Sequence, residues 1–195
     1  MSALLHLIKW RLGLAEPEVW TTEAERACLA RHAAGKRRVA EIGVWHGVTS
    51  CRLRAAMAGD GTYYAVDPYE KGRLGFSIQK VIATRELERV PNGRLIWVRQ
   101  MGYEAARTPK IQRVAPFDFV FIDAPQVHDT IRREWEAWSP LIATGGFIAL
   151  HDSRISPADP EFRPDSLHYA QDVVLKDPRF EVVDAVDYTT VLRRR

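Results

Sequence analysis

From residue 38 onward, short apolar runs alternate with segments of helical periodicity, and this alternation restricts the possible folds more than any other feature of the sequence. The runs are nearly continuous in apolar residues, which is typical of strands covered on both faces. Five of them are predicted to be strands: Arg38–Val44, Thr62–Val66, Arg94–Val98, Phe117–Ile122 and Gly146–Leu150. Strands that alternate with helices form parallel sheets. We therefore predict an α/β fold, doubly wound around a mostly parallel sheet with helices on both faces.

Apolar residues at helical spacing fill the segments between these strands. The predicted helices are Val48–Ala58, a segment that carries Ile78, Val81 and Ile82, Glu104–Val114, and Ile131–Trp138. Trp135 and Trp138 are assigned to packing of the last helix against the sheet. Gly145 and Gly146 are expected to stop the preceding element.

The last residues of the chain do not follow this alternation of strands and helices. Two apolar runs, Phe180–Val186 and Tyr188–Leu192, are separated only by Asp187, which leaves no room for a crossover helix. Such runs pair as a hairpin or lie antiparallel to their neighbour. We therefore predict that the last strand of the sheet is antiparallel.

Residues 1–35 are predicted to be a helical extension of a single domain that spans residues 36–195. Within Met1–Leu14, an apolar face recurs at Leu4, Ile8 and Leu12, and the segment is too short to span a membrane. We expect this helix to pack on the domain as a lid or on a second subunit in a homodimer; an interfacial membrane helix is the less favoured alternative. A second helix is predicted to run to about Ala34, with Thr21 or Thr22 as its cap and Glu25 completing a capping box.

Charge and cysteine content exclude several classes of protein. The net charge is +3, but the clusters Lys36–Arg38 and Arg193–Arg195 supply six cations, and without them acidic residues outnumber basic ones. A broad basic face is therefore not expected, which argues against nucleic-acid binding. Cys28 and Cys51 lack CxxC spacing, so neither a disulfide framework nor a zinc site is predicted, and a cytoplasmic location is expected.

Polar residues gather where the predicted strands end. In an open parallel sheet, ligands bind beyond the carboxyl ends of the strands. The five ends carry Glu41-Ile42-Gly43, Asp67-Pro68-Tyr69, Gln100-Met101-Gly102, Asp123-Ala124-Pro125 and His151-Asp152-Ser153. Acids thus follow four of the five strands, which predicts a ligand site at this edge.

The first strand end continues into an E-x-G-x-x-x-G-x-S turn that runs from Glu41 to Ser50. Gly43 and Gly47 permit positive φ and a close approach of ligand to backbone. This spacing is not the G-x-G-x-x-G of dinucleotide sites, which disfavours an NAD-type oxidoreductase. Glu41 suits the ammonium of a ligand, and Asp67 at the next strand end suits the two hydroxyls of a ribose.

Four segments in order, EIGVWHGVTS, YYAVDPY, FDFVFIDA and Trp135–Ser153, resemble the class I S-adenosylmethionine-dependent methyltransferases, in particular the catechol-type and macrocin-type O-methyltransferases. The resemblance covers most of residues 21–195. It implies a Rossmann-like fold, S-adenosylmethionine as cofactor, and methyl transfer to a hydroxyl of a small molecule such as a sugar or secondary metabolite. A cofactor-binding protein of this fold without catalysis is the alternative.

The resemblance also implies roles for individual residues. Glu41, Gly43 and Gly47, with Ser50 of the same motif, would line the methionine part of the cofactor, and Asp67 would bind its ribose. Tyr69, Gln100, Met101 and Gly102 would surround the adenine, and Asp123 would lie near the sulfonium. In the resembled families the acids that correspond to Asp123 and Asp152 hold magnesium, and His151 is the candidate third ligand.

One departure from the family pattern concerns the catalytic base. Relatives follow the fourth strand with D-x-D-H, whereas this chain has Pro125 and Gln126 where the second acid and the histidine would stand. His128 lies two residues further on and is predicted as general base, because imidazole titrates near neutral pH. The catalytic candidates are therefore Asp123, His128 and His151, and both a metal-dependent and a metal-free reaction stay open.

Two further segments are expected near the site. Trp45 and His46 lie inside the first turn and are candidates for contact with cofactor or acceptor. Ser156–Arg163, rich in proline and acids, is predicted either as a mobile flap over the acceptor or as an inert connection.

Overall fold

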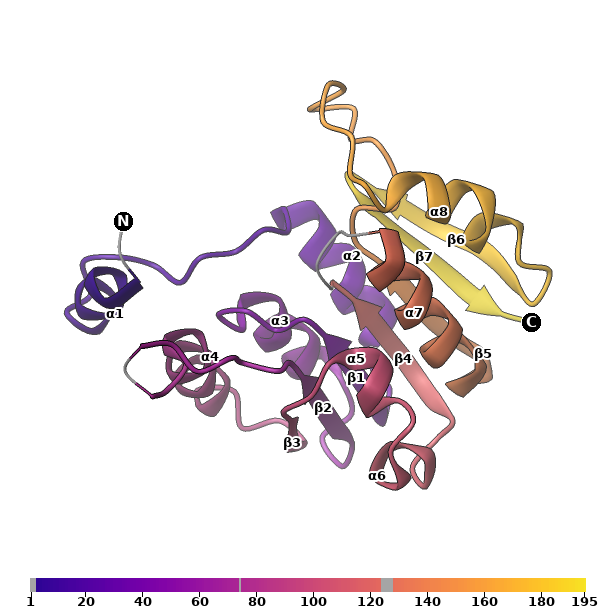
Figure 1. The fold of residues 1–195 in the computed structure, drawn as a ribbon. Coiled ribbons are helices and arrows are strands. Elements are labelled where there is room, and N and C mark those ends of the chain that lie inside the picture. Colours follow the sequence, from indigo (N-terminus) through magenta and orange to yellow (C-terminus); the bar gives the residue numbers. More distant parts are fainter. Residues whose placement is uncertain (1–2, 74, 124–127) are drawn as a thin grey trace.

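A computed structural model describes residues 3–73, 75–123 and 128–195, and its centre is a seven-stranded sheet in the order β3-β2-β1-β4-β5-β7-β6 (Figure 1). The strands are β1 (Arg38–Ile42), β2 (Thr62–Val66), β3 (Arg94–Val98), β4 (Phe117–Ile122), β5 (Ile142–Leu150), β6 (Phe180–Val186) and β7 (Thr189–Arg194). The first five are parallel, and β7 is antiparallel to both β5 and β6. The predicted α/β fold with an antiparallel last strand is confirmed.

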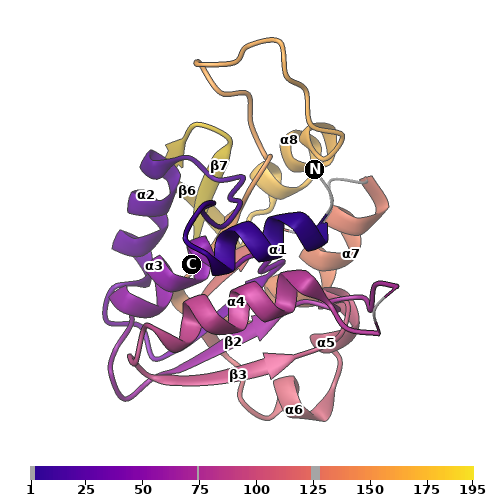
Figure 2. The same cartoon turned by 90° about the vertical axis from the view of Figure 1, so that its left-hand side faces the viewer.

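Helices cover both faces of this sheet (Figures 1 and 2). The elements on one face are α2 (Glu23–Ala33), α3 (Val48–Ala56) and α4 (Ile78–Glu88); those on the other are α5 (Gly102–Ala105), α6 (Pro109–Gln112), α7 (His128–Trp138) and α8 (Leu167–Asp172). Successive side chains of a strand point to opposite faces, so Val39 packs under the first layer and Ala40 under the second.

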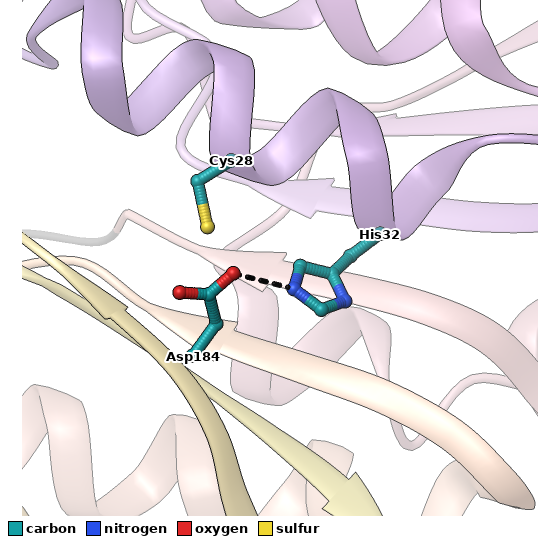
Figure 3. Close-up of side chains that lie close together, drawn as sticks. All are labelled: Cys28, His32 and Asp184. Atoms are coloured by element: carbon teal, nitrogen blue, oxygen red, sulfur yellow. Dashed lines mark hydrogen bonds and ion pairs between the residues drawn. The ribbon is translucent and has the colours of Figure 1, made fainter.

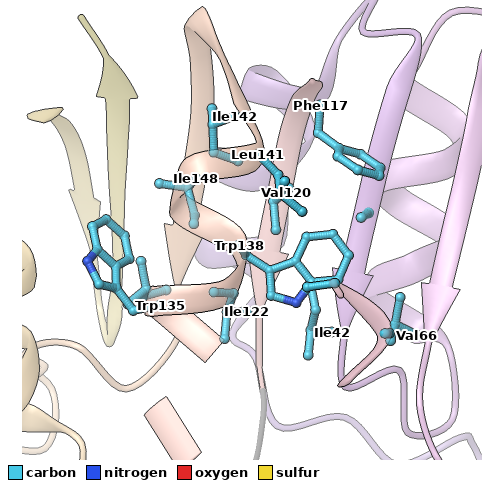
Figure 4. Close-up of a cluster of buried hydrophobic side chains, with 14 of the residues drawn as sticks. Ile42, Val66, Phe117, Val120, Ile122, Trp135, Trp138, Leu141, Ile142 and Ile148 are labelled. Carbon is cyan, nitrogen blue, oxygen red and sulfur yellow. The ribbon is translucent and has the colours of Figure 1, made fainter. Parts of the chain in front are cut away.

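The core beneath α7 is built around Trp138, which is fully buried (Figure 4). Its ring meets Phe117 edge-on with centroids 5.5 Å apart, and its Nε1 donates a hydrogen bond to the carbonyl of Gly102 at 3.1 Å. Trp135, 2% exposed, packs on Phe180 of β6. The assignment of both tryptophans to helix-to-sheet packing is confirmed.

The predicted helix Glu104–Val114 was wrong, since two short helices, α5 and α6, replace it. Pro109 breaks the segment because it lacks an N–H and disfavours a helical conformation at the residue before it. Thr108 is accordingly extended and caps α6, accepting the backbone N–H of Ile111 at 3.4 Å.

The limits of several strands and helices also differ from the predictions. β1 ends at Ile42 because Gly43 has φ +87°, outside the strand region. β5 begins at Ile142 and runs through both glycines, where its register against β4 shifts. α7 begins at His128 rather than Ile131, and β7 runs over Thr189–Arg194 rather than Tyr188–Leu192.

The N-terminal helix α1 (Ala3–Arg11) lies along α4 (Figure 2). Trp10 Nε1 donates to a Glu86 carboxylate oxygen at 3.0 Å, and His6 is buried. The predicted apolar face points elsewhere, since Leu4, Ile8 and Leu12 are 45%, 48% and 67% exposed. The packing of α1 on the domain thus uses other residues than predicted, and a role as lid or dimer contact stays a prediction.

The second helix follows its sequence signals closely. The Thr22 hydroxyl accepts the Glu25 N–H at 3.1 Å, and the Glu25 carboxylate accepts the Thr22 N–H at 2.7 Å, which is the predicted capping box. In the described part of the chain, no helix combines the length and the apolar character needed to cross a membrane.

Candidate active site

A cleft of about 830 Å³ opens at the carboxyl ends of the parallel strands. Its wall includes Gly43 and Trp45 after β1, Asp67 and Pro68 after β2, Met101 and Gly102 after β3, Asp123 after β4, and His151 and Asp152 after β5. The sheet order makes this edge a crevice, because the chain runs from β1 outward to β3 and then returns to β4 beside β1. The polar strand ends therefore meet in one place, as predicted.

His151 stands among three carboxylates. Its Nδ1 lies 3.1 Å from Asp123 Oδ1 and 2.9 Å from Asp152 Oδ2, and its Nε2 lies 3.6 Å from Glu25 Oε2. Burial alone would lower the pKa of His151, but the Asp123 carboxylate, with Asp152 and Glu25, raises it to about 12. His151 is therefore held as a cation by its acidic neighbours.

Glu25 is a site residue that sequence reasoning missed. Its side chain is fully buried, and besides Thr22 it accepts the Tyr188 N–H at 3.0 Å and the Thr189 hydroxyl at 2.8 Å. Burial raises the pKa of Glu25, but its bonds with His151 and the other donors outweigh this and lower it. The capping box was visible in the sequence, whereas the contact with a hairpin more than 160 residues away carries no local signal.

The three predicted metal ligands come together. One ligand atom each from Asp123, His151 and Asp152 lies within 4.8 Å of the other two. Both ring nitrogens of His151 face carboxylates, so a metal ion that binds here must displace a proton from the imidazolium ring. Two carboxylates and an imidazole fit a divalent cation, and whether one binds stays a prediction.

Asp67 ties two strand ends together. Its Oδ2 accepts the N–H groups of Val44 and Trp45 at 3.0 and 3.3 Å, and its Oδ1 accepts the Tyr69 N–H at 2.8 Å. The carboxylate thus fixes the loop that contains Gly43 while it borders the cleft. Asp67 therefore lies where it could accept the ribose hydroxyls of a cofactor, and this contact stays a prediction.

The predicted adenine residues divide into two groups. Met101 and Gly102 line the cleft, and Gln100 is exposed beside them. The Tyr69 ring is only 4% exposed; its hydroxyl donates to the carbonyl of Trp45 at 3.0 Å and its ring meets Trp97 edge-on. Tyr69 therefore packs beneath the loop that contains Trp45 and stabilises it. Contact of adenine with any of the four predicted residues stays a prediction.

Glu41 and Ser50 lie beneath the first loop. The Glu41 carboxylate, 1% exposed, accepts hydrogen bonds from the Ser50 and Tyr63 hydroxyls. Burial raises the pKa of Glu41 to about 8. Gly47 has φ +81° at the start of α3, and a Cβ there would lie 3.3 Å from Ala83 of α4, so this glycine permits close helix packing. Direct contact of these residues with a ligand stays a prediction.

Glu134 of α7 is a second residue that sequence reasoning missed. It is fully buried, it lines the cleft, and burial raises its pKa to about 7. A Cβ at Gly102 would lie 2.4 Å from a Glu134 carboxylate oxygen, so only glycine fits at that position. The sequence offered one signal, an acid between two core positions of an amphipathic helix.

The other candidate segments are placed only in part. His128 is the first residue of α7, and its side chain lies outside the described residues, as do residues 124–127. The segment Ser156–Arg163 borders the cleft through Asp159 and Phe162. Trp45 also lines it, whereas His46 is buried, stacks between His6 and Trp45, and accepts the Glu18 N–H at 2.9 Å.

Backbone strain concentrates at the same edge. Among the described non-glycine residues, four have positive φ, and three of them follow parallel strands: Trp45 at 49°, Tyr69 at 45° and Asp152 at 53°. L-residues adopt this region at an energetic cost, and such conformations often occur at binding sites.

A pH-dependent stability difference is expected for Glu41→Gln. Native Glu41 holds its proton up to about pH 8, whereas the unfolded side chain loses it near its ordinary value of 4.5. The free energy of unfolding of the wild type therefore falls as pH rises, because the unfolded Glu41 side chain ionises more easily than the native one. Glutamine does not ionise, so the variant avoids this loss of stability. Urea unfolding from pH 5 to 8.5 should show the variant gaining stability relative to wild type as pH rises.

The matched control for this measurement is Glu88→Gln, whose side chain is 58% exposed. It should give a stability difference that is nearly constant with pH. If Glu41→Gln also gave a constant difference, the conclusion that buried Glu41 keeps its proton up to about pH 8 would be wrong.

Residues 40–153 match the sequence model of a family described as a methyltransferase domain, which covers more than half of the chain. The chain belongs to this methyltransferase family. The resemblance to methyltransferases seen in the sequence motifs is thereby confirmed. No curated protein sequence matches the chain.

Solved structures of other methyltransferases are similar to it. The O-methyltransferase TomG from Streptomyces achromogenes is 17% identical with a TM-score of 0.66, over 100% of this chain and 90% of TomG. An O-methyltransferase from Bacillus cereus is 17% identical with a TM-score of 0.67, over 100% and 91%. An rRNA methylase from Streptococcus thermophilus is 11% identical with a TM-score of 0.58, over 90% and 99%. These likenesses confirm the Rossmann-like methyltransferase fold.

Proposed function

We propose that this methyltransferase binds S-adenosylmethionine in the cleft and transfers its methyl group to a hydroxyl of a small molecule. The observation that carries the proposal is the gathering of Gly43, Asp67, Asp123, His151 and Asp152 along one cleft at the carboxyl edge of the sheet. TomG was crystallised with S-adenosylmethionine and the Bacillus cereus enzyme with S-adenosylhomocysteine, which supports the same cofactor here.

In this proposal the loop after β1 receives the cofactor. Gly43 presents backbone without a side chain, and Asp67 accepts the ribose hydroxyls while its other bonds keep the loop in place. Methyl transfer is an in-line displacement, in which the C–O bond forms as the C–S bond breaks and the sulfur keeps the electron pair. The protein therefore needs mainly to align the acceptor oxygen with the methyl carbon.

The acceptor must also lose its proton. Asp123, His151 and Asp152 would hold a divalent cation, which when bound lowers the pKa of the acceptor hydroxyl. Buried Glu25 keeps His151 oriented from behind. His128, predicted from the sequence as general base, is the candidate to accept the proton, and a metal-free reaction that relies on alignment uses the same residues.

The position of the two basic clusters Lys36–Arg38 and Arg193–Arg195 favours a small-molecule acceptor over a nucleic acid bound through these clusters. β1 begins at Arg38 and the antiparallel β7 ends at Arg194, so both basic clusters lie at the edge of the sheet opposite to the cleft. Phosphate contacts from these clusters would hold a nucleic acid away from the site.

Calorimetric titration with S-adenosylhomocysteine, with and without magnesium, tests the proposal. We expect specific binding of S-adenosylhomocysteine and none of NAD, which serves as the control ligand. Absence of binding to folded protein would contradict the cofactor assignment. If the cofactor binds, transfer of labelled methyl groups to a panel of hydroxyl compounds and to RNA distinguishes the acceptor classes, and transfer to none favours the non-catalytic alternative.

A further inference from the structure

A second group of metal-ligating side chains lies apart from the cleft, between α2 and β6. Cys28 and His32 of α2 both face Asp184 of β6 (Figure 3). His32 Nε2 lies 3.1 Å from Asp184 Oδ2, and one ligand atom from each of the three residues lies within 4.8 Å of the other two. A sulfur, a nitrogen and an oxygen ligand therefore converge on one point.

The backbone explains this convergence. Residues four apart lie on the same face of a helix, so Cys28 and His32 project side by side, the spacing that also places paired histidines on one metal. Zinc bonds of about 2.0–2.3 Å set tetrahedral ligand atoms about 3.3–3.6 Å apart. The His32–Asp184 distance is already close to this, and the Cys28 sulfur lies within 4.8 Å of both other ligand atoms, so a small side-chain adjustment brings it into range.

We propose that Cys28, His32 and Asp184 bind a divalent transition-metal ion of the zinc type, with water as the fourth ligand. Thiolate and imidazole select zinc and cobalt over magnesium, whereas the cluster of Asp123, His151 and Asp152 offers no sulfur. Cys28 is fully buried, but the His32 and Asp184 side chains are 17% and 28% exposed. The ion therefore has an entry path from the side of Asp184.

One cation competes for this position. Arg31 Nη2 lies 3.1 Å from Asp184 Oδ2, and its side chain is 61% exposed, so it can swing into solvent when a metal ion binds. Burial, reinforced by Asp184, raises the pKa of Cys28 to about 12. Binding must therefore displace the thiol proton and should weaken as pH falls.

The site would join two elements that also support the cleft. Glu25 lies one helical turn before Cys28 on α2 and holds the start of β7 through Tyr188 and Thr189. A metal ion between α2 and β6 would fix the same helix to the other strand of this hairpin. No local sequence pattern signals this site, because the third ligand is distant in the chain and CxxC spacing is absent.

The test is titration of the full, reduced, metal-free chain with Co²⁺, monitored by the near-ultraviolet charge-transfer band of cobalt–thiolate bonds. The wild type and the matched control Cys51→Ser should both show the band, and Cys28→Ser should lose it. Cobalt bound at the cleft has no thiolate ligand, because neither cysteine lines the cleft, and it gives no such band. His32→Ala and Asp184→Asn should each weaken binding at least about tenfold, and Arg31→Ala should strengthen it.

The readout separates this proposal from the methyltransferase function, since it requires no cofactor or acceptor. Circular dichroism checks that each variant is folded; if Cys28→Ser does not fold, the His32 and Asp184 variants decide. No band in the wild type, or a band lost in Cys51→Ser but kept in Cys28→Ser, would overturn the site.

Discussion

Asp67→Ala is expected to weaken S-adenosylhomocysteine binding by at least about 100-fold. In the proposed complex the substitution removes the acceptor of both ribose hydroxyls. A hydrogen bond to a charged group is worth about 1.5–3 kcal/mol. The substitution also removes the acceptor that holds the N–H groups of Val44, Trp45 and Tyr69. Calorimetric titration of the folded variant measures the effect directly.

Asp60→Ala is the matched control, because Asp60 follows α3, is 62% exposed and pairs only with exposed Arg37 among the described residues. Its affinity should equal that of wild type. The affinity of Asp67→Asn for S-adenosylhomocysteine should lie between those of Asp67→Ala and Asp60→Ala, since an amide oxygen can still accept hydrogen bonds from backbone N–H groups. If Asp67→Ala bound the ligand as tightly as wild type, the orientation proposed for the cofactor would be incorrect.

Glu25→Ala is expected to lower the free energy of unfolding by about 3–5 kcal/mol, because it breaks a buried charge pair and leaves buried donors without partners. The N–H groups of Thr22 and Tyr188 and the hydroxyl of Thr189 would all lose their acceptor. Chemical denaturation monitored by circular dichroism measures the loss. Glu25→Gln should cost less, since its amide oxygen can still accept one or two of these bonds.

The control for this experiment lies two residues earlier on the same helix. Glu23 is 64% exposed and pairs with Arg26 and Arg52 at the surface. Exposed ion pairs contribute about 0–1 kcal/mol, so Glu23→Ala should change stability only slightly. Equal effects of the two substitutions would mean that Glu25 acts only as a helix cap and not as the link between α2, the hairpin and His151.

Much of the fold could be predicted from the sequence because its strands are nearly continuous in apolar residues, and strands buried on both faces are easily recognised. Local chemistry caused the errors. Pro109 split a predicted helix, and Gly145 lies inside β5 instead of ending the element before that strand. The apolar face of α1 is exposed because His6 and Trp10 make its contacts, and periodicity alone does not reveal which face has a partner.

Prediction of the site depended on a topological rule. Parallel strands bring their carboxyl ends together, so the sequence alone predicts that Asp67, Asp123, His151 and Asp152 meet. Glu25 and Glu134 could not be predicted in this way, because both reach the site from helices. The sequence marks Glu25 as part of a capping box and Glu134 as an acid between core positions, but their contacts at the site depend on tertiary packing.

Trp45, Tyr69 and Asp152 adopt left-handed backbone conformations at the cleft edge, and these conformations lower the stability of the fold while they shape the site. Each costs about 1–3 kcal/mol, which the packed layers of helices must offset. An effort to make this protein more heat-resistant would therefore be drawn to glycine or asparagine at Trp45, whose side chain is 37% exposed and where strain is easiest to relieve. That substitution would remove a side chain that lines the cleft, so thermostability would be gained at the expense of ligand binding.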